Sequence, residues 1–143
     1  MVELCRSFRI GNPDTVGPGI CLSAAVFDGT RLYMAGNGTS IAGTAYPGSI
    51  RALDPATGKA LWQRGLASSV YGSPSEDGSG VLAVATWDTS GAGNRVYLIN
   101  AANGSVIGTL STGNSVTFAQ PVFADHYLFI ATVGHGLIAY APG

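Results

Sequence analysis

The sequence predicts an all-β protein assembled from repeated units of four short strands. Its 143 residues include 21 glycines and seven prolines, which interrupt short apolar segments as tight turns do in all-β chains. A two-strand pattern around one turn, from Ser49 to Trp62, recurs from Arg95 to Ile107, with Gly58 and Gly104 46 residues apart. Helix signals are nearly absent, so we expect sheets throughout.

The strands of each repeat can be placed in order along the chain. The first strand and its turn are expected at 24–29, 72–78 and 120–125, and the second strand at 32–36, 82–86 and 128–132. The third and fourth strands form the hairpin around the glycine turn. Because the apolar runs are nearly continuous, the sheets should be covered on both faces by neighbouring sheets. A repeat of four short strands at this period is typical of a β-propeller blade.

This period divides the chain into an incomplete propeller of about three blades. We expect a preceding strand and linker at 1–18, blade one at 19–67, blade two at 68–113 and a partial blade three at 114–143. The segment Val2–Ile10 is the preceding strand. Closed propellers need about 4–8 blades, so three blades should not close alone. Either the chain is a portion of a longer propeller, or a second copy covers its end sheets by self-association.

The hairpin motif resembles the repeat of the pyrroloquinoline-quinone (PQQ) type of β-propeller, found in quinoprotein dehydrogenases and in non-enzymatic relatives. The resemblance runs roughly from Cys21 to the end of the chain. The matching positions in the first repeat are Ala52, Asp54, Thr57, Gly58 and Trp62. In the second repeat Asn100 replaces Asp54 and Gly104 is kept, but Asn103 and Gly108 stand where the motif has Thr and Trp.

The resemblance implies that Trp62 docks on the turn of a neighbouring blade. A large aromatic side chain that needs a partner for its indole N–H suits this role. Stacking of a ligand on Trp62 is the alternative.

The candidate binding residues are expected on one rim of the blades. That rim carries the connections between second and third strands and between blades, with long loops at Asn37–Gly48 and Trp87–Asn94, where binding residues concentrate. The candidates are Tyr46, Ser69, Tyr71, Trp87, Asp88, Asn94 and His135. His135 could equally be an exposed hairpin tip and Asp88 a loop cap. On the opposite rim the acidic and Asn residues are interpreted as turn caps rather than metal ligands.

No catalytic or metal-binding constellation is expected in this chain. The sequence has no zinc-type spacing, no Gly-x-Ser-x-Gly motif and no phosphate loop in a strand-to-helix context. The quinoprotein dehydrogenases use a vicinal cysteine pair and a calcium or lanthanide site, and neither pattern is found in this sequence. PQQ and calcium are therefore expected only if the chain is part of a larger quinoprotein.

Three function classes remain open. The first is a non-enzymatic scaffold that holds a protein or peptide partner. The second is a C-terminal fragment of a PQQ-dependent oxidoreductase whose cofactor site lies outside this chain, which an upstream cysteine pair with acidic ligands would favour. The third is a propeller that binds a glycan or small ligand through Tyr46, Tyr71 and Trp87. A formal charge of −1 argues against nucleic acid as a partner.

The cellular location is expected to be extracytoplasmic, periplasmic or secreted, as is common in the family that the chain resembles. The N-terminus lacks the apolar core of a signal peptide, and no apolar run is long enough to span a membrane. Cys5 and Cys21 could form one disulfide or remain as two buried thiols, and the spacing does not decide between them.

Overall fold

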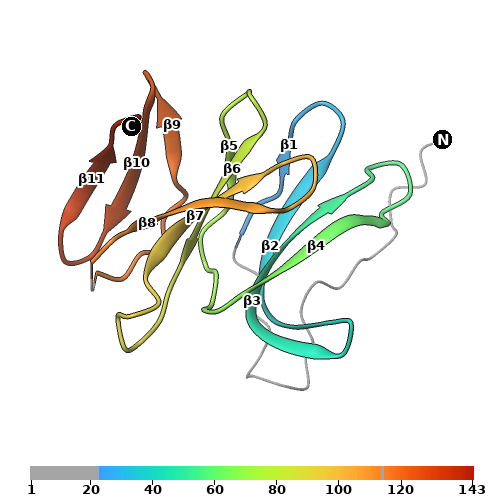
Figure 1. Cartoon of the computed structure of the whole chain (residues 1–143), viewed down its shortest axis with the longest axis horizontal. Helices are drawn as coiled ribbons and strands as arrows, with labels where there is room; N and C mark the ends of the chain where they lie inside the picture. The colour runs from blue at the N-terminus through green and yellow to red at the C-terminus, as the bar shows by residue number, and fades with distance from the viewer. Residues whose placement is uncertain (1–22, 114) are drawn as a thin grey trace.

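The computed structural model describes residues 23–113 and 115–143, which form eleven β-strands and no helix. The strands make three antiparallel sheets, which we call blade one (β1–β4), blade two (β5–β8) and blade three (β9–β11). Figure 1 shows the three sheets side by side in chain order. The predicted all-β class is therefore confirmed. The predicted strand at Val2–Ile10 and the pair Cys5 and Cys21 lie outside the described residues.

The strands follow one another across each sheet. Blade one contains β1 (Val26–Phe27), β2 (Leu32–Ile41), β3 (Thr44–Leu53) and β4 (Ala60–Leu66). Blade two contains β5 (Ser75–Glu76), β6 (Val81–Thr86), β7 (Arg95–Asn100) and β8 (Val106–Ser111). Blade three contains β9 (Val122–Ala124), β10 (Tyr127–Thr132) and β11 (Gly136–Tyr140), so β11 is an edge of its sheet. No helix among the described residues has the length and apolarity to cross a membrane.

The hydrophobic core lies between consecutive blades. One cluster joins Tyr33 and Ile50 of blade one to Leu82 and Val84 of blade two. A second cluster joins Val96 of blade two and its neighbours to blade three. Since side chains alternate between the two faces of a strand, β6 supplies both clusters.

The turns between the third and fourth strands repeat the same geometry in blades one and two. The N–H groups of Gly58 and Gly104 donate to the carbonyls of Asp54 and Asn100 at 2.7 and 2.8 Å. The two glycines have φ values of 69° and 72°, a region that few other residues adopt. Both turns therefore place glycine where the backbone needs a positive φ.

The predicted long loop at Asn37–Gly48 is wrong. Strands β2 and β3 continue through this segment as a hairpin and pair Thr39 with Tyr46. Its turn is only Ala42–Gly43, with φ values of 50° and 82°, which match the right-handed twist of a two-residue hairpin. The segment is rich in Gly, Ser and Thr, so its composition resembled a loop while cross-strand pairing kept it extended.

Trp62 lies at the junction of blades one and two. Its Nε1–H donates to the carbonyl of Ala101 at 2.9 Å, and its ring covers Gly104, where an added Cβ would lie 2.5 Å from the indole. Arg64 Nε donates to the Gly104 carbonyl at 2.7 Å. A half-buried aromatic ring and two hydrogen bonds therefore attach blade one to the glycine turn of blade two.

Candidate functional site: an aromatic cluster on the loop rim

Three aromatic side chains meet on the rim formed by the connections between blades. The Tyr71 ring lies 5.3 Å from the Trp87 ring and 5.7 Å from the Phe118 ring, both in edge-on arrangements. Trp87 and Phe118 are 6.1 Å apart. We call these three residues the aromatic cluster. Phe118 is 56% exposed, so an apolar ring from this cluster faces solvent.

The two blade connections bring the cluster together by close backbone contact. Tyr71 lies between β4 and β5, and Phe118 lies between β8 and β9. An added Cβ at Gly72 would lie 2.3 Å from the carbonyl oxygen of Ala119, so only glycine permits this approach. Ser69 contributes through its backbone, because its carbonyl accepts the N–H of Trp87 at 2.7 Å.

The Trp87 indole is a further feature of the site. Its Nε1 is buried and has no hydrogen-bond partner among the described residues. Buried indole N–H groups usually find a partner. Trp87 thus contributes to the cluster both an apolar ring and an N–H group that has no acceptor among the described residues.

Asp88 and Asn94 stabilise the Trp87–Asn94 loop from within. The Asp88 carboxylate accepts from the N–H and the hydroxyl of Ser90 at 3.0 and 2.7 Å, and from the N–H of Gly93 at 3.2 Å. The hydrogen bonds from Ser90 hold the pKa of Asp88 below its ordinary value. Asn94 Oδ1 accepts the N–H of Asp88 at 2.7 Å. These contacts support the loop-cap interpretation of Asp88.

The structure separates the other two candidates from the aromatic cluster. Tyr46 lies in β3, where its ring covers Gly65: an added Cβ there would lie 2.3 Å from the ring. His135 lies in the exposed turn between β10 and β11, with Nδ1 3.4 Å from the carbonyl of Thr112.

Phe118 was not among the predicted candidates, although the repeat contained a signal for it. Tyr71 stands three residues before Pro74, and Phe118 stands three residues before Pro121. Aligning these two prolines would have placed Phe118 at the equivalent position of the next blade.

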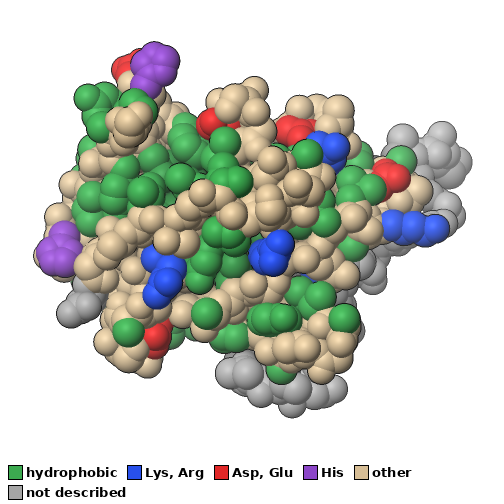
Figure 2. All heavy atoms as spheres, in the orientation of Figure 1, with side chains coloured by type: hydrophobic (Ala, Val, Ile, Leu, Met, Phe, Trp, Pro, Cys, Tyr) green, Lys and Arg blue, Asp and Glu red, His purple; other side chains and the backbone are tan. Residues whose placement is uncertain are grey.

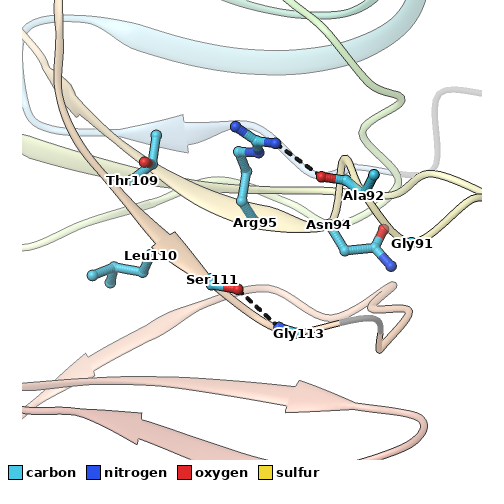
Figure 3. A pocket seen from close by; sticks show the side chains of 8 residues that line it. All are labelled: Gly91, Ala92, Asn94, Arg95, Thr109, Leu110, Ser111 and Gly113. Carbon is cyan, nitrogen blue, oxygen red and sulfur yellow. Dashed lines mark hydrogen bonds between the residues drawn. The ribbon is translucent and has the colours of Figure 1, made fainter.

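A shallow groove of about 340 Å³ lies beside the Trp87–Asn94 loop. Figure 3 shows its lining residues and two hydrogen bonds, from Arg95 to the Ala92 carbonyl at 2.9 Å and from the Gly113 N–H to Ser111 at 3.1 Å. The Arg95 guanidinium also lies 6.0 Å from the centre of the Tyr97 ring. The polar groups of the groove therefore bind one another rather than converging on a reacting atom.

A second groove, on the opposite rim, contains Asp28 and Glu76. Asp28 accepts the Tyr33 hydroxyl at 2.6 Å, and Glu76 accepts the N–H groups of Gly78 and Gly80, each at 2.9 Å. Burial alone would raise the pKa of Asp28, but the hydrogen bonds from Tyr33, Arg31 and Thr30 outweigh it and hold that pKa far below its ordinary range. Both carboxylates thus cap turns by accepting backbone N–H groups.

Neither groove contains the acidic donor set of a calcium site. Calcium takes six to eight oxygen ligands, and no three His, Cys, Asp or Glu residues cluster within the described part of the chain.

Comparison with known proteins agrees with this architecture. A sequence model of the family described as outer membrane protein assembly factor BamB matches residues 46–142, more than half of the chain. The crystal structure of BamB from Moraxella catarrhalis superimposes with a TM-score of 0.61 at 13% sequence identity, over 90% of this chain and 38% of that chain. This protein therefore spans well under half the length of the structure that it matches. No curated protein matches the sequence. On the strength of the family match, the chain belongs to the PQQ-type repeat family of β-propellers.

Proposed function

We propose that this protein is a non-enzymatic propeller scaffold that binds a protein or peptide partner through the aromatic cluster on its loop rim. The observation that carries the proposal is the exposure of Phe118 in a cluster of three rings that the connections between the blades bring together. Exposed aromatic residues that project from a rigid scaffold are typical contact points of protein partners. The name of the matched family, an assembly factor, supports a role of this class.

The proposed location is extracytoplasmic. The description of the family refers to assembly of outer membrane proteins, which supports a periplasmic or secreted protein. Binding to the proposed partner would then take place outside the cytoplasm.

A glycan is a less suitable ligand for the aromatic cluster. Sugar recognition combines a free ring face with several convergent polar groups, whereas Tyr71 and Phe118 pack edge to face against each other here. The oxidoreductase alternative would need its ligands from chain outside the described residues, because the described acidic groups cap turns.

A peptide library panned on this protein tests the proposal. Peptides enriched on the wild-type chain should bind Phe118→Ser and Tyr71→Ala about 30-fold more weakly, because truncating an aromatic hot spot costs about 2 kcal/mol or more. Val133→Ser is the matched control, since Val133 is 75% exposed in the turn between β10 and β11. The affinity of the enriched peptides for Val133→Ser, measured by fluorescence titration, should equal their affinity for the wild type.

Two results would contradict the proposal. One is the failure of any peptide to enrich. The other is enrichment of peptides that bind Phe118→Ser and wild type equally well. Saturable sugar binding lost in Trp87→Ala would favour the glycan alternative instead.

A further inference from the structure

The fourth strand of blades one and two is the outermost strand of its sheet. Strands β4 and β8 pair with β3 and β7 on one side and with no described strand on the other. Neighbouring blades pack on the two faces of blade two, through the clusters that contain Val84 and Val96, so they leave the edge of β8 open. An open edge presents unpaired N–H and C=O groups that can pair with another extended chain.

The ladder between β7 and β8 determines which backbone groups of β8 point outward. At its start the Asn100 N–H donates to the Ser105 carbonyl at 2.8 Å. Hydrogen-bonded and non-hydrogen-bonded pairs alternate along an antiparallel ladder. The register shifts once, between Leu98 and Ile99, and such a bulge counts as one position. Counted from Asn100, Thr109 takes a non-hydrogen-bonded position, so its N–H and C=O point away from β7.

The sequence of β8 lacks the residues that usually protect an edge. Natural edge strands carry charged side chains, above all lysine, or proline. The outer strand of blade one follows this rule, because Arg64 lies within β4 and Lys59 directly precedes it. In contrast, β8 reads Val-Ile-Gly-Thr-Leu-Ser, and no charged residue stands between Arg95 and Asp125. The edge of blade two is therefore unprotected against pairing.

The surface along β8 is neutral and partly apolar. Val106 is 42% exposed and Ile107 is 55% exposed. Figure 2 shows mainly neutral and hydrophobic side chains along the course that β8 takes in Figure 1. β-Branched residues such as these favour extended pairing. The edge should thus pair best with a segment that is itself rich in β-branched residues.

A groove at the end of β8 offers a place for one side chain of the added segment. The groove of about 340 Å³ is lined by Thr109 and Ser111 of β8 and by residues that include Gly91 and Arg95 (Figure 3). Arg95 is the only charged residue in this lining. One of its N–H groups binds the Ala92 carbonyl, and a guanidinium has five, so others remain for a carboxylate. Charge complementarity therefore favours an acidic side chain in the groove.

We infer that the free edge of β8 binds an extended segment of a protein partner as a fifth strand of blade two. An acidic side chain of that segment occupies the groove at the end of β8. Main-chain hydrogen bonds to Thr109 supply affinity, and the groove selects the sequence. The inference uses none of the rings of the aromatic cluster, so it stands without the function proposed above.

A peptide library panned on the Phe118→Ser chain tests the edge in the absence of the complete aromatic cluster. The enriched peptides should contain alternating β-branched residues and an Asp or Glu near one end. Methylation of the peptide nitrogens that face β8, at alternate residues, should weaken binding about tenfold or more. Methylation of the other nitrogens should change the affinity by less than about twofold, because those N–H groups point to solvent.

A proline substitution locates the binding edge on the protein. Thr109→Pro removes the outward N–H and should weaken peptide binding about tenfold or more, while the β7–β8 ladder keeps its bonds. Ala60→Pro is the matched control on β4: the Asp54 N–H donates to the Lys59 carbonyl, so the next pair, Leu53 with Ala60, is non-hydrogen-bonded. It should bind the peptides as tightly as the parent chain. Circular dichroism checks folding, and the methylated peptides test the edge on a chain without proline substitutions.

The groove is tested through the acidic residue of an enriched peptide. Its replacement by the corresponding amide should weaken binding about tenfold and should have no effect on binding to Arg95→Gln. Equal affinity of both peptides for the parent chain would overturn the assignment of the groove. Failure of any peptide to enrich, tolerance of methylation at every position, or undiminished binding to a folded Thr109→Pro chain would overturn the inference as a whole.

Discussion

The junction between blades one and two differs from the junction between blades two and three, although both join repeats of the same type. At the first junction Trp62 and Arg64 donate hydrogen bonds to the glycine turn of blade two at 2.9 and 2.7 Å. At the second, Gly108 occupies the position of Trp62, and the Tyr140 hydroxyl donates to the Ser111 carbonyl at 2.6 Å. The motif residues Trp62 and Arg64 thus attach blade one to blade two, and we expect the degenerate repeat to form a weaker attachment to blade three.

The buried side chains differ in the same direction. Blade one contributes Tyr33, Ile50 and Ala52 to the first cluster, all fully buried. Blade two contributes the smaller Ala83, Ala85 and Val96 to the second. Since stabilisation scales with the apolar area removed from water, the first junction should contribute more to the free energy of unfolding.

Of the substitutions considered for the two junctions, removal of the Trp62 side chain should lower the free energy of unfolding most. The first junction should then contribute about as much to stability as the second. We expect Trp62→Ala to lower the free energy of unfolding by about 3 kcal/mol, because a packed ring and a hydrogen bond to Ala101 are both lost. Urea denaturation measures the loss. Leu61→Ala, at a neighbouring position that is 52% exposed, should change stability by about 0.5 kcal/mol. Equal losses in the two variants would mean that Trp62 does not hold the junction.

The two turn glycines have nearly the same φ but different surroundings. Gly58 has nothing within 4 Å of an added Cβ, whereas at Gly104 the Cβ would lie 2.5 Å from the Trp62 ring. Both alanine variants incur backbone strain of about 1 kcal/mol. Gly104→Ala should lose about 1–2 kcal/mol more through overpacking.

Thermal or urea unfolding of the two alanine variants compares them directly. The difference between Gly104→Ala and Gly58→Ala should vanish when both are made in the Trp62→Ala background, as a double-mutant cycle would show. If the two alanine variants still differ in their free energy of unfolding without Trp62, the difference arises from the turn itself and not from contact with the Trp62 ring.

Features encoded by local chemistry were predictable from the sequence. The turn at Asp54–Gly58 closes on itself: the Asp54 carboxylate accepts the N–H of Ala56 at 2.8 Å, and Asn100 repeats this with Ala102 at 2.9 Å. Such a turn needs only a side-chain acceptor and a glycine, so the repeat, the blades and the positive φ values followed from the residue types.

Features that depend on partners distant in the chain were not predictable in the same way. The segment Asn37–Gly48 is extended because each strand pairs with the other, and its own composition does not specify this. Phe118 meets Tyr71 across 47 positions, and the contact depends on the close approach at Gly72. The aromatic cluster was therefore only partly predicted, through Tyr71 and Trp87, whereas Tyr46 and His135 proved to lie elsewhere.

The smallest expected effect concerns the attachment that replaces Trp62 at the second junction. Tyr140→Phe removes the donor to Ser111 and should lower the free energy of unfolding by about 0.5–1 kcal/mol, the net value of one hydrogen bond. Tyr127→Phe is the matched control, because the Tyr127 hydroxyl binds nothing within the described residues. Burial raises the pKa of Tyr140 in the folded state, so its contribution is complete below the unfolded pKa of about 10 and is lost as pH rises through the folded value. The wild type should therefore lose its advantage over Tyr140→Phe in alkaline urea titrations, and a constant difference at all pH values would show that the hydroxyl does not stabilise this junction.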